Sequence, residues 1–102
     1  MSRPDHDVRL LRVAEEDLAD ILSYIAADRP AAAVALASRF ERDLSLLGRT
    51  PLLGRVPKEA ELARQGYRYI VVDSYLVFYT VEPTLVLVHR VLHGARDYQS
   101  LL

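Results

Sequence analysis

The sequence predicts a single α+β domain in the order β-α-α-β-β-β, with a hairpin of two helices packed on one face of an antiparallel sheet. Two observations support this fold class. Apolar residues recur at helical spacing between Ala14 and Leu47, and β-branched and aromatic residues gather in short runs from Gly66 to His93. Helices and strands that are segregated along a chain are typical of layered α+β folds. A chain of 102 residues suffices for one domain and is too short for two, so the domain is expected to cover residues 1–102.

The N-terminal half is expected to form a short strand and two helices. The strand is predicted at Val8–Val13. The apolar stripe of the first helix contains Ala14, Leu18, Ile21, Leu22 and Ile25. The stripe of the second contains Ala33, Leu36, Ala37, Phe40, Leu44 and Leu47. Pro30 suits the first turn of the second helix, where its missing N–H is not needed, and Gly48 is expected to end that helix. The short link between the helices predicts an antiparallel hairpin.

The C-terminal half is expected to form a loop and three strands. Residues 50–64 carry the proline and glycine of a loop, in which 59–64 could form a helical turn. The strands are predicted at Tyr67–Asp73, Tyr75–Val81 and Thr84–His93. The dipeptides Asp73-Ser74 and Glu82-Pro83 are typical of turns, so the strands should form an antiparallel meander. Residues 95–102 could add a last helical turn.

Two-residue turns would fix the register of both hairpins. The first would pair Val72 with Tyr75, and the second would pair Val81 with Thr84 and Tyr75 with Arg90. Paired residues share a face, so one face would hold Arg68, Ile70, Val72, Tyr75, Val77, Tyr79, Val86, Val88, Arg90 and Leu92. The helices are expected on the opposite face, which carries Leu76, Phe78, Leu85, Leu87 and Val91. A β-bulge in either hairpin would reverse the assignments beyond it.

The first of these faces is the predicted functional face. Its centre is an aliphatic strip that comprises Ile70, Val72, Val77, Val86 and Val88. A small domain is expected to have no second layer that covers such a strip, and an exposed apolar patch usually marks the site of a partner. We therefore expect these five residues to bind a protein.

Polar side chains at one end of this face, and beyond it, are candidates for chemistry. They are Arg68, Tyr75, Tyr79, Arg90, His93, Arg96 and Tyr98. The two strand arginines could converge on a phosphate or carboxylate, the two strand tyrosines could stack on a base, and the histidine could act as a general acid or base. Structural roles stay open for all of them, because arginines pair with carboxylates, strand tyrosines pack, and a histidine before a glycine often makes only a structural hydrogen bond.

Composition excludes several kinds of site. The chain has no cysteine, which excludes disulfides, thiolate zinc sites and cysteine nucleophiles. Three scattered histidines and the lack of a glycine-rich phosphate loop give no reason to expect a metal or cofactor. The net charge of −1 leaves little positive charge for nonspecific binding of nucleic acid. A polar N-terminus and the absence of a run approaching roughly 20 apolar residues predict a cytoplasmic protein.

Four segments carry a resemblance to a known family. They are AEEDLADILSYIA, TPLLGR, GYRYIVVDSYLVFYTV and VHRVLHGARDYQSLL, in this order and spacing. Over nearly the whole chain they resemble the RelE/ParE superfamily, the toxins of type II toxin–antitoxin systems. The resemblance implies a compact toxin that arrests growth and that a cognate, ParD-like antitoxin wraps and inhibits.

The superfamily contains two kinds of toxin. RelE-like members cut mRNA on the ribosome without a metal, and ParE-like members block DNA gyrase. In this resemblance, Arg68 in the GYR motif matches an arginine that RelE-like enzymes use near the scissile phosphate. His93 falls close to the position at which some of those nucleases have a catalytic histidine. If the chain is a nuclease, its catalytic residues would be Arg68, Arg90, His93 and Tyr98. A glycine nevertheless follows His93 where those relatives carry a terminal tyrosine, and the lysine-rich loop of RelE is reduced to Lys58.

We therefore favour a ParE-like gyrase inhibitor that is not an enzyme. A toxin that must sit in ribosomal RNA should be strongly basic, and this chain is not. The ending RVLHGARD also resembles ParE-type sequences more than RelE-type ones. The alternatives are a ribosome-dependent mRNA endoribonuclease and an inactive relative that only binds an antitoxin.

Overall fold

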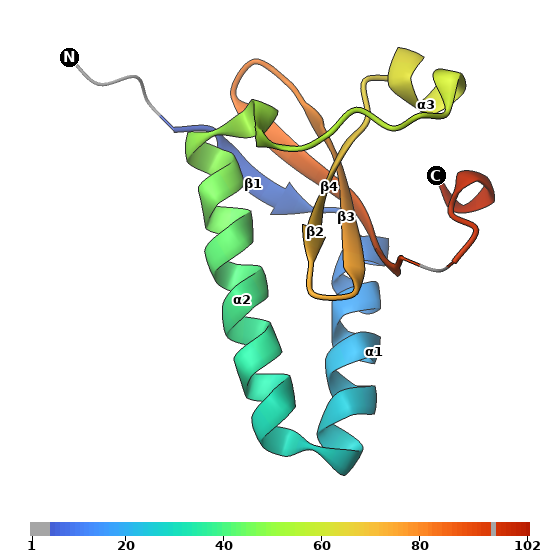
Figure 1. Ribbon diagram of the computed structural model, residues 1–102. Coiled ribbons are helices and arrows are strands. Elements are labelled where there is room, and N and C mark those ends of the chain that lie inside the picture. The colour runs from blue at the N-terminus through green and yellow to red at the C-terminus, as the bar shows by residue number, and fades with distance from the viewer. Residues whose placement is uncertain (1–4, 95) are drawn as a thin grey trace.

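The computed structural model describes residues 5–94 and 96–102 and confirms the predicted α+β fold and element order. A long helix hairpin covers one face of a twisted four-stranded sheet, and its tip extends beyond the sheet (Figure 1). The helices are α1 (Arg12–Asp28), α2 (Pro30–Arg49) and α3 (Ala60–Arg64). The strands are β1 (Asp7–Leu10), β2 (Arg68–Val72), β3 (Tyr75–Val81) and β4 (Leu85–His93). Short 3-10 turns lie at Pro51–Leu53 and Gln99–Leu101.

The sheet is mixed, whereas the sequence predicted an antiparallel one. The strand order is β1-β4-β3-β2, and β2, β3 and β4 form the predicted antiparallel meander. β1 runs parallel to β4 and pairs Val8 with Val86. It is also shorter than predicted, because the chain turns into α1 at Arg12 after Leu11 donates a last hydrogen bond of 2.9 Å to the carbonyl of Val88.

The second helix does not stop at Gly48. Pro30 occupies its first turn as predicted, but α2 continues through Gly48 to Arg49. Gly48 is buried where α2 passes the residue before β1, and His6 donates a hydrogen bond of 2.9 Å to its carbonyl. A Cβ atom at this position would lie 2.8 Å from the backbone oxygen of His6. The glycine therefore permits a close approach of two backbones and is not a helix stop.

The register of the first hairpin was predicted correctly, and that of the second was wrong. Val72 pairs with Tyr75 as expected. Val81 pairs with Val86, because the two-residue turn lies at Pro83-Thr84, one residue later than predicted. It is closed by Glu82 and Leu85, which exchange backbone hydrogen bonds of 2.7 and 3.4 Å. A register shift between Phe78 and Tyr79 then leaves His89 without a partner residue on β3. Tyr75 consequently lies opposite His93 and not opposite Arg90.

The helices cover the face that was expected to be exposed. Val72, Val77, Tyr79, Val86 and Val88 are fully buried in the main core, and Ile70 packs partly buried against it. The prediction of an exposed aliphatic strip is therefore wrong, and with it the reason for assigning these residues to a partner. Up to Val88 the residues had been grouped on faces correctly, but both faces are apolar, so their pattern alone did not identify the one that holds the helices.

The opposite face has a cover of its own. Leu62, Tyr67, Phe78 and Leu92 are buried in a second, smaller cluster. Residues of the sheet and of the C-terminal segment pack on it: Tyr69, Leu76, Tyr98, Leu101 and Leu102. The expectation that a small domain has no second layer failed because α3 and the C-terminal segment supply one. Within residues 5–94 and 96–102, no helix has the length and apolarity needed to cross a membrane.

Candidate functional site

Arg90 is used in a structural ion pair. Its Nε and one terminal nitrogen donate to the carboxylate of Asp17 in α1 at 2.8 and 2.9 Å. The same carboxylate accepts the backbone N–H of Val91 at 3.0 Å. The hydrogen bonds that Arg90 donates to Asp17 raise the pKa of Arg90, so the guanidinium stays charged. Both side chains are mostly buried, with exposed fractions of 16% and 14%. The ion pair therefore links α1 to β4 at the position where the bulge interrupts the sheet.

Arg68 does not converge with Arg90. Arg68 lies opposite Tyr79 on β3 and Arg90 opposite Phe78, and successive strand residues face opposite sides of a sheet. A terminal nitrogen of Arg68 donates to the carbonyl of Gly54 at 2.9 Å. The two arginines therefore do not converge on a common phosphate or carboxylate site, as the sequence suggested, and each has a separate structural contact.

Tyr79 holds the loop that follows α2. Its hydroxyl accepts the N–H of Gly54 and donates to the carbonyl of Pro51, both at 2.8 Å. Burial raises the pKa of this phenol, and its ring is inaccessible to solvent. Stacking of a base on Tyr79, which the sequence suggested, is therefore excluded in this conformation.

Tyr75 and His93 are brought together at the end of the second hairpin. They are paired residues, and their rings meet edge to face with centroids 5.6 Å apart. Tyr75 is half-buried against Phe40 of α2, whereas His93 is exposed. Of these two residues, His93 is the one that lies open to solvent.

Of the two C-terminal candidates, Arg96 contacts that pair through its backbone, whereas Tyr98 contacts other residues. Arg96 is exposed, and its backbone N–H donates to the carbonyl of His93 at 3.0 Å. The hydroxyl of Tyr98 donates to the Glu59 carboxylate, with oxygens at 2.9 and 3.0 Å, and its ring packs 4.7 Å from that of Phe78. Burial, followed by the contact with Glu59, raises the pKa of Tyr98. Tyr98 therefore anchors the C-terminal segment over the outer cluster.

His89 forms a hydrogen-bonded cluster that the sequence did not indicate. Its Nε2 lies 2.9 Å from the hydroxyl of Thr80 and its Nδ1 lies 3.4 Å from that of Tyr67. Burial lowers the pKa of His89, which favours the neutral ring, while Glu82 acts in the opposite direction. This arrangement depends on the bulge at His89, which no local sequence signal marks.

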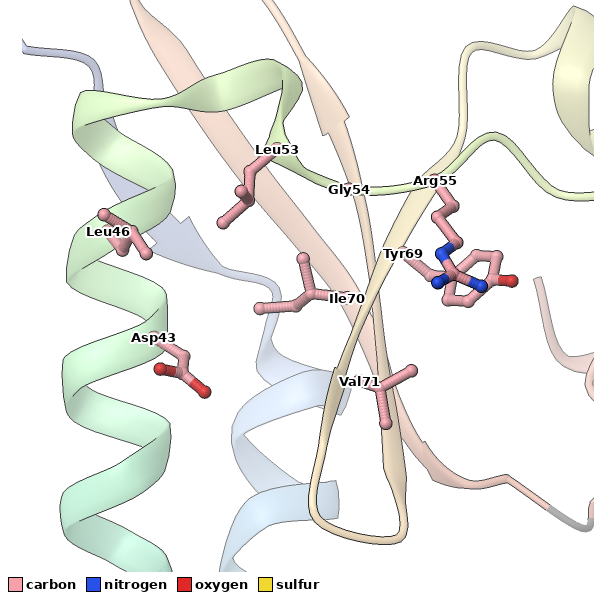
Figure 2. Close-up of a pocket in the computed structure, with 8 residues that line it drawn as sticks. All are labelled: Asp43, Leu46, Leu53, Gly54, Arg55, Tyr69, Ile70 and Val71. Carbon is pink, nitrogen blue, oxygen red and sulfur yellow. The ribbon is translucent and has the colours of Figure 1, made fainter.

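A shallow groove of about 310 Å³ lies between α2 and the free edge of β2. It is lined by Asp43, Leu46, Leu53, Gly54, Arg55, Tyr69, Ile70 and Val71 (Figure 2). Several of its apolar side chains are exposed, with fractions of 37% for Leu46, 48% for Leu53 and 58% for Val71. The sequence analysis treated this loop only as a connection, although its adjacent leucines before Gly54 were a visible signal. In the part of the chain that the structure describes, no three acidic or histidine side chains are grouped to hold a metal ion.

Residues 8–98 match the sequence pattern described as the ParE toxin of the type II toxin–antitoxin system parDE. The chain belongs to this family. Among solved structures, it is similar to the chromosomal ParDE system of P. aeruginosa, with 15% identity, a TM-score of 0.71, and 86% of this chain and 95% of that one covered. It is also similar to the RelBE2 toxin–antitoxin complex of Mycobacterium tuberculosis, with 26% identity, a TM-score of 0.60, and 87% and 98% covered. No curated protein sequence matches the chain.

The family and the fold agree with the resemblance seen in the four sequence segments. The chain is a toxin of a type II toxin–antitoxin system within the RelE/ParE superfamily. Both similar structures come from toxin–antitoxin systems, which supports an antitoxin as a partner of this toxin.

Proposed function

We propose that this toxin inhibits DNA gyrase in the cytoplasm, that it arrests growth by doing so, and that a ParD-like antitoxin neutralises it. Membership of the ParE family supports this assignment. The main observation in its favour is the bidentate contact between Arg90 and Asp17. A nuclease would need Arg90, together with Arg68, to bind the phosphate of RNA, but here Arg90 forms a structural ion pair.

Two other candidates for nuclease chemistry are similarly engaged. Arg68 donates to the Gly54 carbonyl, and the hydroxyl of Tyr98 donates to Glu59. Cleavage through the 2′-hydroxyl of RNA requires an acid, a base and a cationic group gathered around one phosphate. These residues are distributed over both faces of the sheet, which favours recognition of a protein target over phosphodiester chemistry.

Charge supports the same choice. A protein that sits among ribosomal RNA is expected to carry a basic surface, and this chain has a net charge of −1. Gyrase offers a protein surface as well as DNA, so binding to it does not require a strongly basic toxin.

A supercoiling assay with the purified toxin tests this function. We expect the toxin to inhibit supercoiling by gyrase and expect equimolar antitoxin to restore it. Codon-dependent cuts in mRNA on translating ribosomes, with gyrase unaffected, would replace the proposal with the endoribonuclease. Overexpression that is harmless without antitoxin would indicate an inactive relative that only binds its antitoxin.

A double variant separates the two active mechanisms. Arg68→Ala combined with His93→Ala removes the two residues that the family resemblance assigned to cleavage. Because the proposed function is not nucleolytic, we expect this variant to remain toxic, with a thermal melt measured in parallel to show that it folds. Loss of toxicity in a folded variant, together with loss of mRNA cleavage, would favour the nuclease.

A further inference from the structure

Three side chains form a hydrogen-bonded chain on the face of the sheet opposite the long helices. Nε2 of His89 on β4 lies 2.9 Å from the hydroxyl of Thr80 on β3. Nδ1 lies 3.4 Å from the hydroxyl of Tyr67, which directly precedes β2. The rings of Tyr67 and His89 meet edge to face with centroids 4.9 Å apart. The imidazole is therefore held in one orientation between two hydroxyl groups.

This chain always has one hydroxyl proton that its two hydrogen bonds do not use. Burial lowers the pKa of His89, so the neutral ring is favoured, with one N–H and one nitrogen that accepts. When Nε2 carries the proton it donates to Thr80, and the hydroxyl proton of Thr80 is unused. When Nδ1 carries the proton, Thr80 donates to Nε2 and its oxygen can accept a hydrogen bond from a ligand. Thr80 can therefore adapt to a donor or an acceptor.

A pocket of about 470 Å³ opens beside the chain, between the link from α3 to β2 and the turn from β3 to β4. Its volume lies within the range of roughly 300–1,000 Å³ that is usual for small-ligand sites. A Cβ atom on Gly66 would meet no atom within 4 Å, so this residue leaves the pocket open. The lining consists of Tyr67, Thr80 and His89 together with Gln65, Gly66, Val81, Glu82 and Leu87.

Glu82 gives the pocket a negative charge. It is the one acidic or basic residue in this lining besides the histidine. Burial lowers the pKa of His89 and the charge of Glu82 opposes this shift, so the carboxylate acts directly on the imidazole. Among residues 5–94 and 96–102, no lysine or arginine forms an ion pair with Glu82. A cation is therefore the ligand that this pocket favours.

We propose that the pocket binds a guanidinium group. The planar fork of a guanidinium can donate two parallel hydrogen bonds to the carboxylate of Glu82 and a further one to the oxygen of Thr80. Its flat, weakly hydrated surface suits the apolar side chain of Leu87 better than a compact ammonium does. Because a guanidinium only donates, it selects the arrangement in which Thr80 donates to His89 and accepts from the ligand.

A titration with an arginine derivative tests this site without any partner protein. N-acetyl-arginine amide is added to toxin labelled with ¹⁵N, and N-acetyl-lysine amide is the matched probe with an ammonium. We expect saturable shifts of the backbone amide signals of Gly66, Thr80 and His89, and binding of the lysine derivative at least about tenfold more weakly. Shifts that do not saturate, that lie elsewhere, or that the two derivatives cause equally would overturn the proposal.

Two pairs of variants test the groups that would hold the ligand. Glu82→Gln should bind the arginine derivative at least about tenfold more weakly, whereas Glu41→Gln on an exposed position of α2 should bind it like the wild type. Thr80→Val should also bind it more weakly, and Thr80→Ser should retain binding because it keeps the hydroxyl. Wild-type affinity in Glu82→Gln overturns the proposal, and this exposed turn position decides the matter if Thr80→Val does not fold.

The guanidinium could belong to a free molecule or to an arginine side chain of gyrase, and competition separates the two sources. If it belongs to gyrase, saturating N-acetyl-arginine amide should relieve inhibition of supercoiling by the wild type, and the lysine derivative should not. Unchanged inhibition with the pocket saturated supports a site for a free guanidinium compound and excludes gyrase as the source. A toxin that does not inhibit gyrase overturns the proposed function alone, because the titration does not involve gyrase.

Discussion

Asp17 connects the first helix to the irregular part of the sheet through three hydrogen bonds, two from Arg90 and one from the backbone of Val91. Replacing it with alanine would leave the Arg90 guanidinium mostly buried without its partner. We expect Asp17→Ala to lower the free energy of unfolding by about 3 kcal/mol, as for other buried ion pairs that lose one member. Urea denaturation measures this, with Asp20→Ala on the exposed side of the same helix as the control. Equal stability of the two variants would contradict the assignment.

His89 should make stability depend on pH in a defined direction. Burial lowers its pKa in the folded chain below the value of about 6.5 that it has when unfolded. The unfolded chain therefore binds the proton more readily, and the contribution of His89 to stability is complete above the unfolded pKa and is lost as the pH falls below it. We expect the melting temperature to fall between about pH 7 and pH 5, and to fall less in His89→Gln. Parallel curves for the two proteins would refute this.

At the scale of elements, the sequence predicted what depends on local pattern. Both long helices and all four strands lie near their expected positions, because helical and strand periodicities are local properties of the chain. The parallel pairing of β1 with β4 joins distant segments and has no local signal. The position of the second turn at Pro83-Thr84 and the bulge at His89 were likewise not predicted, since no local sequence signal marks either of them.

Gly48 shows how an element depends on its neighbour. Alanine is a better helix former than glycine, so replacing a glycine inside a helix such as α2 with alanine would ordinarily stabilise the protein. Here the new Cβ would lie 2.8 Å from the backbone oxygen of His6. We expect a net loss of about 1–3 kcal/mol in the free energy of unfolding, the usual cost of overpacking. Urea denaturation should show this loss, whereas Ser45→Ala on the exposed side of α2 should be neutral or stabilising. A more stable Gly48→Ala would mean that the backbones separate freely.

At the scale of the whole molecule, the candidate site was the least predictable part. The sequence grouped Arg68, Tyr75 and Tyr79 on one face correctly, yet that face lies under the helices for much of its length. Its partly exposed residues include Arg68 at one end and Tyr75, beside the exposed His93, at the other. To predict which apolar face of the sheet packs against the helices, one must know that α3 and the C-terminal segment cover the other face. That second layer depends on contacts between distant residues, such as that of Tyr98 with Phe78. The groove beside β2 was missed for the same reason, because it exists only between elements.

The charge of the whole chain leads to a last prediction about its target. Nonspecific affinity for nucleic acid comes from phosphate contacts with lysine and arginine, and 13 basic residues here are outweighed by 14 acidic ones. We expect no saturable binding of single-stranded RNA below roughly 100 μM at physiological salt, measured by fluorescence anisotropy. The control is a variant with Glu61→Lys and Glu82→Lys, both at exposed positions. Each replacement raises the net charge by two, so the two together change it from −1 to +3. It should bind RNA more tightly and in a salt-dependent way. Micromolar binding by the wild type that weakens steeply with salt would show that a local basic surface outweighs the net charge, and it would favour RNA as the target over a surface of gyrase.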